Sequence, residues 1–375
     1  MDMRFAHQRL ARQWMLISAT LLLTTTPAMA EIRIGVAGVL TGEISWIGEQ
    51  QEIGARRAVD DINAAGGLLG EQVELVVLDD QCDPELAVAV ANQMIEEGVV
   101  FVNGHTCSGS SLATAPLYKD AGIVQISPTS TTPELTELGY DHFYRVCGRD
   151  DVQGAIAGEF LFNRFSDKTI GVVHDNQAYG KGLAGQTVKA LEERGVKVAL
   201  YEGFEPAQAD YTSLVDNIEK SKVEVLYAGS YQSDASIILT QAAERGIELQ
   251  LVAGDSLASD DFLVYTGDSG IGTLFTFGPD AAKLSSAETV AERIREEDGF
   301  EPNGYTLYSY AAVQVWANAV KVAGSTDVDK LSVAMRSETF DTVLGTLGFD
   351  DKGDVTGIES YIWYVWGEET YGPLQ

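Results

Sequence analysis

Apolar, β-branched runs alternate with segments of helical period along almost the whole chain. Two of the helical segments, 51–67 and 179–195, end in glycine, which is the expected stop just past a helix. Apolar strands that alternate with helices are typical of parallel sheets covered on both faces. The runs that predict strands cover residues 32–40, 73–80, 99–105, 123–128, 169–175, 197–203, 224–230, 249–255 and 272–279.

The first thirty residues follow a different pattern. Arg4, Arg9 and Arg12 precede an apolar run of about ten residues, and Ala28-Met29-Ala30 forms a small-x-small cleavage site. An uncleaved anchor is the alternative, but the run is too short to span a bilayer, which needs roughly 18 apolar residues. The pattern therefore predicts a secretory signal peptide over residues 1–30, cleaved near Ala30.

The remaining length exceeds what one hydrophobic core usually serves. We therefore expect two doubly wound α/β domains in the mature chain. Ligands of such sheets bind beyond the carboxyl ends of the strands, so the residues that follow each predicted strand are the candidates for a site.

Charge narrows the classes of partner. Residues 1–30 hold three Arg and one Asp, and without them the chain has 22 basic and 55 acidic side chains, a net charge of −33. Such a surface repels nucleic acid and anionic lipid. The acidic residues are spread over helical faces, which favours a role in solubility over the capture of cations.

Three cysteines remain after removal of the signal peptide. In an oxidising compartment two of them are expected to pair. Cys82 and Cys107 each follow a predicted strand, so a bridge between them is compatible with the pattern, whereas Cys147 ends an apolar run and is interpreted as a buried free thiol. Histidines and cysteines do not cluster as in a zinc site, so no metal and no cofactor is expected.

The predicted strand ends are rich in hydroxyl groups and aromatic rings and poor in Lys and Arg. They contain no P-loop and no basic cluster, which argues against a phosphate site. The segments concerned are 104–111, 127–135, 174–182, 229–234 and 254–260.

Hydroxyl groups stand at two predicted helix starts. Ser108, Ser110 and Ser111 open one helix, and Thr131 and Thr132 precede a Pro-Glu helix opening. Hydroxyls beside the free N–H groups of a helix start can hold a carboxylate, but serine and threonine are also ordinary helix caps. Both interpretations stay open from the residues alone.

Asp255 is the natural counterpart of these hydroxyls. A carboxylate at a strand end can accept charge-assisted hydrogen bonds from a ligand ammonium, although helix capping would explain it equally. Aromatic residues expected in loops could line a ligand cleft or merely fill a domain surface. They are Trp46 after the first strand, Tyr179 and Tyr231 after later strands, and Tyr305 just ahead of a predicted helix. Trp363 and Trp366 alternate in a terminal strand pattern and are interpreted as core or hinge packing.

Residues 254–257 spell Gly-Asp-Ser-Leu, the nucleophile motif of a large esterase family. A serine nucleophile needs a histidine within hydrogen-bond reach, and no histidine follows His174 in the chain. The segment 267–270 echoes another hydrolase signature and lacks a triad in the same way. His105 and His174 end strands and could approach Ser256, so a secreted serine esterase is kept as a minor alternative.

Taken together, these stretches look like the periplasmic binding proteins of branched-chain amino-acid ABC transporters. The likeness runs over essentially the whole mature chain, and the ordered series is far more specific than any one member. It rests on "GVLTGEISWIGEQQEIGARRAVDDINAAGGLLG", "DDQCDPELAVAVANQM", "GHTCSGSS", "ISPTSTTPELTELGY", "HDNQAYGKGLA" and "YTLYSYAAVQ".

The resemblance implies a type I periplasmic binding protein, with two α/β lobes joined by three crossovers. The first lobe is expected to hold 31–149 plus 279–356, and the second 150–278 plus 357–375. In that family, the residues that match Ser108, Thr129, Ser130 and Thr131 hold the ligand carboxylate, and those that match Tyr179, Tyr231 and Asp255 contact the ligand ammonium. The positions that match Trp46 and Tyr305 border the pocket for the ligand side chain. A family disulfide matches Cys82–Cys107.

The resemblance also implies the function. We expect a monomeric, non-enzymatic periplasmic protein that captures an amino acid, branched-chain or more broadly aliphatic, and delivers it to an ABC permease. Two departures leave the ligand open: leucine and valine binders often have Glu where this chain has Asp255, and some members have an aromatic residue where it has Ser230. A related amide or non-α-amino acid is the alternative ligand.

Overall fold

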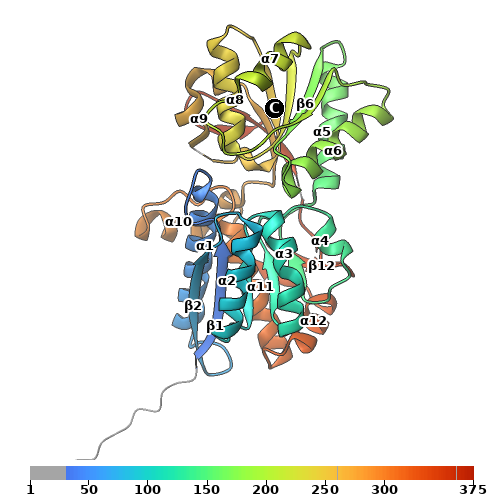
Figure 1. The fold of residues 1–375 in the computed structure, drawn as a ribbon. Helices are drawn as coiled ribbons and strands as arrows, with labels where there is room; N and C mark the ends of the chain where they lie inside the picture. Colours follow the sequence, from blue (N-terminus) through green and yellow to red (C-terminus); the bar gives the residue numbers. More distant parts are fainter. Residues whose placement is uncertain (1–30, 260, 360) are drawn as a thin grey trace, which may run out of the picture.

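The computed structural model describes residues 31–259, 261–359 and 361–375. The expected signal peptide, residues 1–30, lies outside the described residues. Figure 1 shows two bodies of sheet and helix, one above the other. In the described part of the chain, no helix combines the length and the apolar character needed to cross a bilayer.

The first lobe is built on a five-stranded sheet in the order β2-β1-β3-β4-β5, in which every neighbouring pair is parallel. Helices α1 and α11 pack together, and α2 packs with α3. The strands are β1 Glu31–Gly38, β2 Gln72–Asp79, β3 Phe101–Gly104, β4 Val124–Ser127 and β5 Phe143–Arg145. The helices are α1 Ser45–Ala64, α2 Pro84–Glu96, α3 Ser108–Ala121, α4 Glu134–Glu137, α10 Glu288–Glu297, α11 Thr306–Ala323 and α12 Val328–Ser337.

The second lobe is built on a seven-stranded sheet in the order β15-β14-β10-β9-β8-β6-β7. Its strands are β6 Ile170–His174, β7 Leu200–Gly203, β8 Val225–Gly229, β9 Gln250–Ala253, β10 Leu274–Phe277, β14 Ile362–Trp366 and β15 Tyr371–Pro373. Its helices are α5 Asp150–Phe165, α6 Ala178–Glu193, α7 Thr212–Lys220, α8 Gln232–Glu244 and α9 Asp261–Thr266. Short 3₁₀ turns complete the described elements: η1 Asp255–Leu257, η2 Gly267–Gly270 and η3 Ala281–Lys283.

The chain passes between the lobes after β5, after β10 and after β13. Before the last passage it forms a small antiparallel sheet of β11 Phe340–Thr342, β12 Gly345–Phe349 and β13 Val355–Thr356. The two-lobed α/β architecture predicted from the sequence is confirmed. The residue limits given above for the lobes remain predictions.

All nine predicted strands are present, and their order along the chain is the predicted one. The glycines that end the helices also behave as expected, since Gly66 and Gly195 both have positive φ just past α1 and α6. Three differences appear. The sequence pattern missed the three-residue strand β5 and the small antiparallel sheet, and one edge of the second sheet ends in antiparallel pairs of β10, β14 and β15.

Aromatic packing holds both cores. Trp316 of α11 is fully buried and stacks on Phe101 of β3, with ring centroids 5.0 Å apart. Trp366 is buried among the rings of the second lobe, and Trp363 stacks on Phe160 of α5 at 4.0 Å. The expected packing role of the two terminal tryptophans is therefore observed. Helix α11 is buried along most of its length, which explains its apolar sequence.

Replacing Trp316 by alanine is expected to lower the free energy of unfolding by about 3–5 kcal/mol, because it leaves a cavity against the sheet. Denaturant unfolding of the mature protein measures the change. Val322→Ala, at a position of the same helix whose side chain is 58 % exposed, is the matched control and should lower it by well under 1 kcal/mol. Equal losses in the two variants would contradict this description of the core.

Candidate functional site

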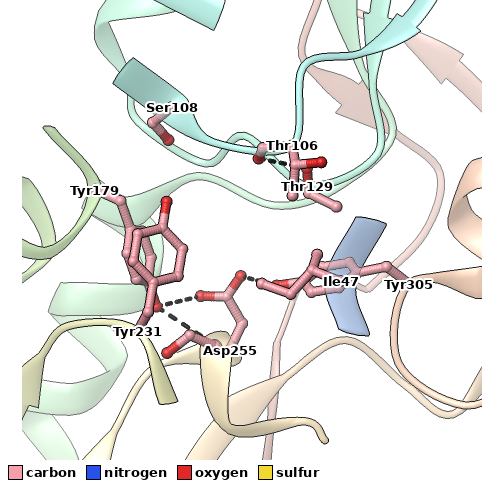
Figure 2. Close-up of a pocket in the computed structure, with 9 residues that line it drawn as sticks. Ile47, Thr106, Ser108, Thr129, Tyr179, Tyr231, Asp255 and Tyr305 are labelled. Carbon is pink, nitrogen blue, oxygen red and sulfur yellow. Dashed lines mark hydrogen bonds between the residues drawn. The ribbon is translucent and has the colours of Figure 1, made fainter. Parts of the chain in front are cut away.

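A small cavity lies where the carboxyl ends of the two sheets face each other. This is the position that doubly wound sheets offer to a ligand. Figure 2 shows hydroxyl side chains on one wall and tyrosines with a carboxylate on the other. The cavity is lined by Ile47, Thr106, Ser108, Thr129, Tyr179, Tyr231, Asp255, Ser256 and Tyr305.

The structure brings together six of the nine residues predicted to bind ligand. They come from both lobes and from positions up to about two hundred residues apart in the chain, so only the fold makes them neighbours. Their part in binding stays a prediction. The six are Ser108, Thr129, Tyr179, Tyr231, Asp255 and Tyr305.

Asp255 is the charged centre of the cavity. Its carboxylate is buried and accepts hydrogen bonds at Oδ1 from Gln153 (3.0 Å) and from the Tyr179 hydroxyl (2.9 Å). The Tyr305 hydroxyl donates to Oδ2 from the other lobe (Figure 2). Burial raises the pKa of Asp255, and these three hydrogen bonds oppose the rise because they favour the charged form.

Helix capping, the alternative explanation for Asp255, is not observed. The residue opens the short turn η1, and its side chain makes no capping hydrogen bond there. Its three donors instead come from α5, α6 and the residue before α11. The carboxylate is therefore committed to the cavity.

The opposite wall consists of hydroxyl groups at the ends of β3 and β4. Thr129 donates to the carbonyl of Thr106 (2.6 Å), and the Thr106 hydroxyl donates to Gln51 (2.6 Å). Ser108 begins α3, and its Oγ accepts a hydrogen bond from the N–H of Thr132 (3.4 Å). Neither α3 nor α4 has a side-chain cap, so plain capping does not explain these hydroxyls.

Ser130 and Thr131 lie behind this wall and do not line the cavity. The Ser130 hydroxyl donates to the carbonyl of His105 (3.0 Å) and pairs with Ser111 (2.8 Å). The Thr131 hydroxyl lies next to the buried carboxyl of Asp150. The structure thus gives both side chains packing partners away from the cavity.

The aromatic residues sit on helix starts. Tyr179 is in the first turn of α6 and Tyr231 directly precedes α8, and their rings are 5.2 Å apart. Trp46 was expected in a loop, but it lies in the first turn of α1 because the helix already begins at Ser45. Trp46 lines a neighbouring hollow, while Ile47, the next residue, faces the cavity.

The cysteines follow the sequence prediction. Cys82 and Cys107 form a disulfide, with Cα atoms 5.4 Å apart, which ties the loop after β2 to the start of α3. Cys147 is buried and free. Burial raises the pKa of its thiol, so it is not an activated nucleophile.

Ser256 lacks the partner that a catalytic serine needs. Its hydroxyl donates to the carbonyl of Ser230 (2.7 Å). His105 is engaged by Asp80 (2.5 Å) and Tyr118 (2.9 Å), and His174 accepts a hydrogen bond from the N–H of Asn176. No histidine of the described residues is hydrogen-bonded to Ser256, and within the same residues no group of three or more His, Cys, Asp or Glu side chains is placed to hold a metal ion.

Sequence reasoning missed four residues of this region. Ile47 and Thr106 line the cavity, Gln153 orients Asp255, and Asp175 is buried directly after β6. Gln153 is one helical turn after Asp150 and has no motif of its own, so no local signal could have identified it. Thr106, by contrast, lies in the hydroxyl-rich segment 104–111 already highlighted.

Similarity to known proteins extends over most of the chain. The family described as periplasmic binding protein matches residues 31–367. A Leu/Ile/Val-binding protein homolog of Brucella melitensis is 40 % identical over 90 % of this chain and 91 % of its own. A leucine-, isoleucine-, valine-, threonine- and alanine-binding protein of Pseudomonas aeruginosa is 36 % identical over 98 % of each.

Solved structures show the same fold. A leucine-binding protein of Thermotoga maritima superposes with a TM-score of 0.83 and 26 % identity, covering 92 % of this chain and 98 % of its own. A benzoate-bound solute-binding protein of R. palustris, at 17 % identity, reaches 0.81 over 92 % of this chain and 96 % of its own. The second likeness shows the fold alone.

Asp175 provides a test by pH. It lies at the end of β6, its Oδ1 accepts from the N–H of Gln177 (2.9 Å), and burial raises its pKa to about 7. The ordinary pKa of an aspartate, near 3.8, applies to the unfolded chain. Between that pH and about pH 7 the folded state therefore keeps a proton that the unfolded state has lost, and the free energy of unfolding falls as the pH rises. Asp175→Asn keeps the acceptor and removes the charge. The difference in free energy of unfolding between Asp175→Asn and wild type should therefore shift in favour of the variant by about 2 kcal/mol between pH 5.5 and 8.

Urea unfolding at several pH values measures this difference. Asp329→Asn, at an exposed position of α12, is the control and should follow the wild-type pH curve. Parallel curves for Asp175→Asn and wild type would show that the buried carboxyl does not govern this pH dependence.

Proposed function

The chain belongs to the periplasmic binding protein family, and from this membership we propose that it captures an aliphatic α-amino acid between its lobes and delivers it to an ABC permease. The observation that carries the proposal is the buried carboxylate of Asp255 facing a wall of hydroxyl groups across one small cavity. A zwitterion has one charged group for each wall.

The ligand ammonium is assigned to Asp255. A carboxylate has about four acceptor positions, and Gln153, Tyr179 and Tyr305 use three of them. One position is left for an N–H of the ligand, with an ion pair in a site largely removed from solvent. The rings of Tyr179 and Tyr231 stand beside that position and add cation–π attraction.

The ligand carboxylate is assigned to the hydroxyl wall. None of the nine lining residues is basic, so a carboxylate there would be held by hydroxyl and N–H donors instead of an ion pair. Ser108 at the first turn of the 14-residue helix α3 supplies a hydroxyl where the helix also presents free N–H groups. The Thr129 and Thr106 hydroxyls already donate their protons to Thr106 and Gln51, so Ser108 and the N–H groups of the helix start are the donors assigned to the carboxylate.

The ligand side chain is the least constrained group. Ile47 and the tyrosine rings offer an apolar surface, which suits an aliphatic chain. The Pseudomonas aeruginosa relative is named for five aliphatic or hydroxylated amino acids, so a broad set is in keeping with the family. An amide or a non-α-amino acid is the second candidate, because Asp255 holds its charge one methylene further back than a glutamate would.

Capture works through the two lobes. A ligand held at Ser108 and Thr129 belongs to the first lobe, and one held at Asp255 and Tyr179 belongs to the second. Contacts to both lobes stabilise the closed arrangement, which the permease then recognises. We place this cycle in the periplasm, after cleavage of the signal peptide near Ala30, and we expect the protein to act as a monomer without covalent chemistry.

Replacing Asp255 by asparagine is expected to weaken binding about 100-fold, or about 2.7 kcal/mol, because the ion pair to the ammonium is lost. Calorimetric titration of ligand-stripped mature protein with leucine, isoleucine, valine, alanine, γ-aminobutyrate and a short amide measures it. Wild type should bind at least one α-amino acid at micromolar Kd or tighter. Asp268→Asn, an exposed acidic position of the same lobe, should leave the Kd within twofold.

Unchanged affinity in Asp255→Asn would remove this residue from the site. If no amine gave heat with wild type, non-amine acids would be titrated next. Ester hydrolysis would follow, with Ser256→Ala as its control, and hydrolysis abolished by that substitution would replace the transport function with an esterase.

A further inference from the structure

Behind the hydroxyl wall, one carboxylate joins two arginines. Asp354 lies directly before β13, and its Oδ1 is 2.7 Å from Nε of Arg145. Its Oδ2 accepts from Nη1 of Arg149 at 2.6 Å and from the hydroxyl of Thr136 at 3.0 Å. Arg145, on β5, has a fully buried side chain, so this ion pair is largely removed from solvent. We call these four residues the Asp354 junction.

The junction reaches the wall through Arg145. Its Nη1 donates to the main-chain carbonyls of Ser130 and Thr132, both at 2.9 Å, and its Nη2 donates to Thr136 at 2.9 Å. In a trans peptide the carbonyl and the next N–H point in opposite directions. Anchoring the Ser130 carbonyl therefore fixes the direction of the Thr131 N–H, within the turn that the resemblance assigns to the ligand carboxylate.

The junction also touches two of the three passages between lobes. Arg149 is the residue before α5, where the chain first enters the second lobe, and Asp354 precedes the last passage, from β13 to β14. The N–H of Asp150 donates to the carbonyl of Thr131 (2.9 Å), so the same turn is tied to the first residue of α5 as well. A rotation of the lobes must pivot next to this cluster.

The charges at the junction are balanced locally. Arg149 also pairs with Asp151 (2.8 Å) and Glu137 (3.0 Å), which leaves Asp354 as the carboxylate that faces buried Arg145. A guanidinium forms fixed, planar donor geometry, whereas a lysine ammonium does not. The position of the 129–132 turn thus depends on the planar donor geometry of the Arg145 guanidinium and not on its positive charge alone.

We propose that Asp354 is a positioning residue, which through Arg145 holds the 129–132 turn in register with the two passages between the lobes and so couples ligand capture to closure. It does not line the cavity, and its effect on the ligand is transmitted by the turn. The inference rests on the proposed function, since it concerns the turn assigned to the ligand carboxylate.

The test compares Asp354→Asn with Asp151→Asn in the full mature protein. Both substitutions remove one carboxylate partner of Arg149, but Asp151 does not contact Arg145. Calorimetric titration with L-leucine should show at least a tenfold weaker Kd for Asp354→Asn and a change within twofold for Asp151→Asn. Small-angle X-ray scattering should show a smaller decrease in radius of gyration on adding saturating L-leucine to Asp354→Asn than to wild type.

Arg145→Lys covers the case in which Asp354→Asn does not fold. It keeps the buried charge opposite Asp354 and loses the fork to the two carbonyls, so its Kd for L-leucine should also rise at least tenfold. Thermal unfolding without ligand is recorded for every variant. A purely structural role would lower the melting temperature and leave the Kd and the scattering change of the folded protein as in wild type.

Folded Asp354→Asn or Arg145→Lys with wild-type Kd and wild-type closure would overturn the inference and leave the proposed function standing. A wild-type protein that does not bind L-leucine while binding another amino acid moves the test to that amino acid. Wild-type protein that binds no amino acid overturns the proposed function, and the inference falls with it.

Discussion

The rest of the site depends on one constraint: a carboxylate is buried at the meeting point of two lobes. Asp255 loses its hydration there, and burial alone disfavours its charge. Gln153 and Tyr179 from its own lobe, with Tyr305 from the other, replace part of that hydration. The remaining acceptor capacity faces the cavity, and this is the property that a ligand ammonium would satisfy.

The wall that faces Asp255 is built from uncharged groups. It has hydroxyl groups and a helix start and no basic side chain, so it favours an anion without holding a full positive charge. Its geometry is set from behind by Arg145, whose own charge is balanced by Asp354. A full charge thus lies at the surface of one wall and behind the surface of the other. In the proposed function, this difference between the walls sets the orientation of the bound zwitterion.

Much of this arrangement was visible in the sequence because it depends on local pattern. Nine apolar runs became the nine expected strands, and strand ends supplied five of the six predicted residues that line the cavity. The failures share a physical cause. Strand β5 is three residues long and carries a buried arginine, so apolar periodicity could not reveal it. Trp46 was placed in a loop because α1 starts without a capping side chain, and the usual signal for a helix start was absent.

The sequence by itself determined the alternation of strands and helices, the export signal as a prediction, and which segments end at the carboxyl edges of the sheets. These follow from periodicity and from residue chemistry, which are properties of neighbours in the chain. Only the tertiary structure decided that Gln153 and Tyr305 donate to Asp255, that Ser130 and Thr131 stand behind the wall, and that Asp354 joins two arginines. Those contacts link residues up to about two hundred positions apart, and their geometry depends on how two lobes fold and meet.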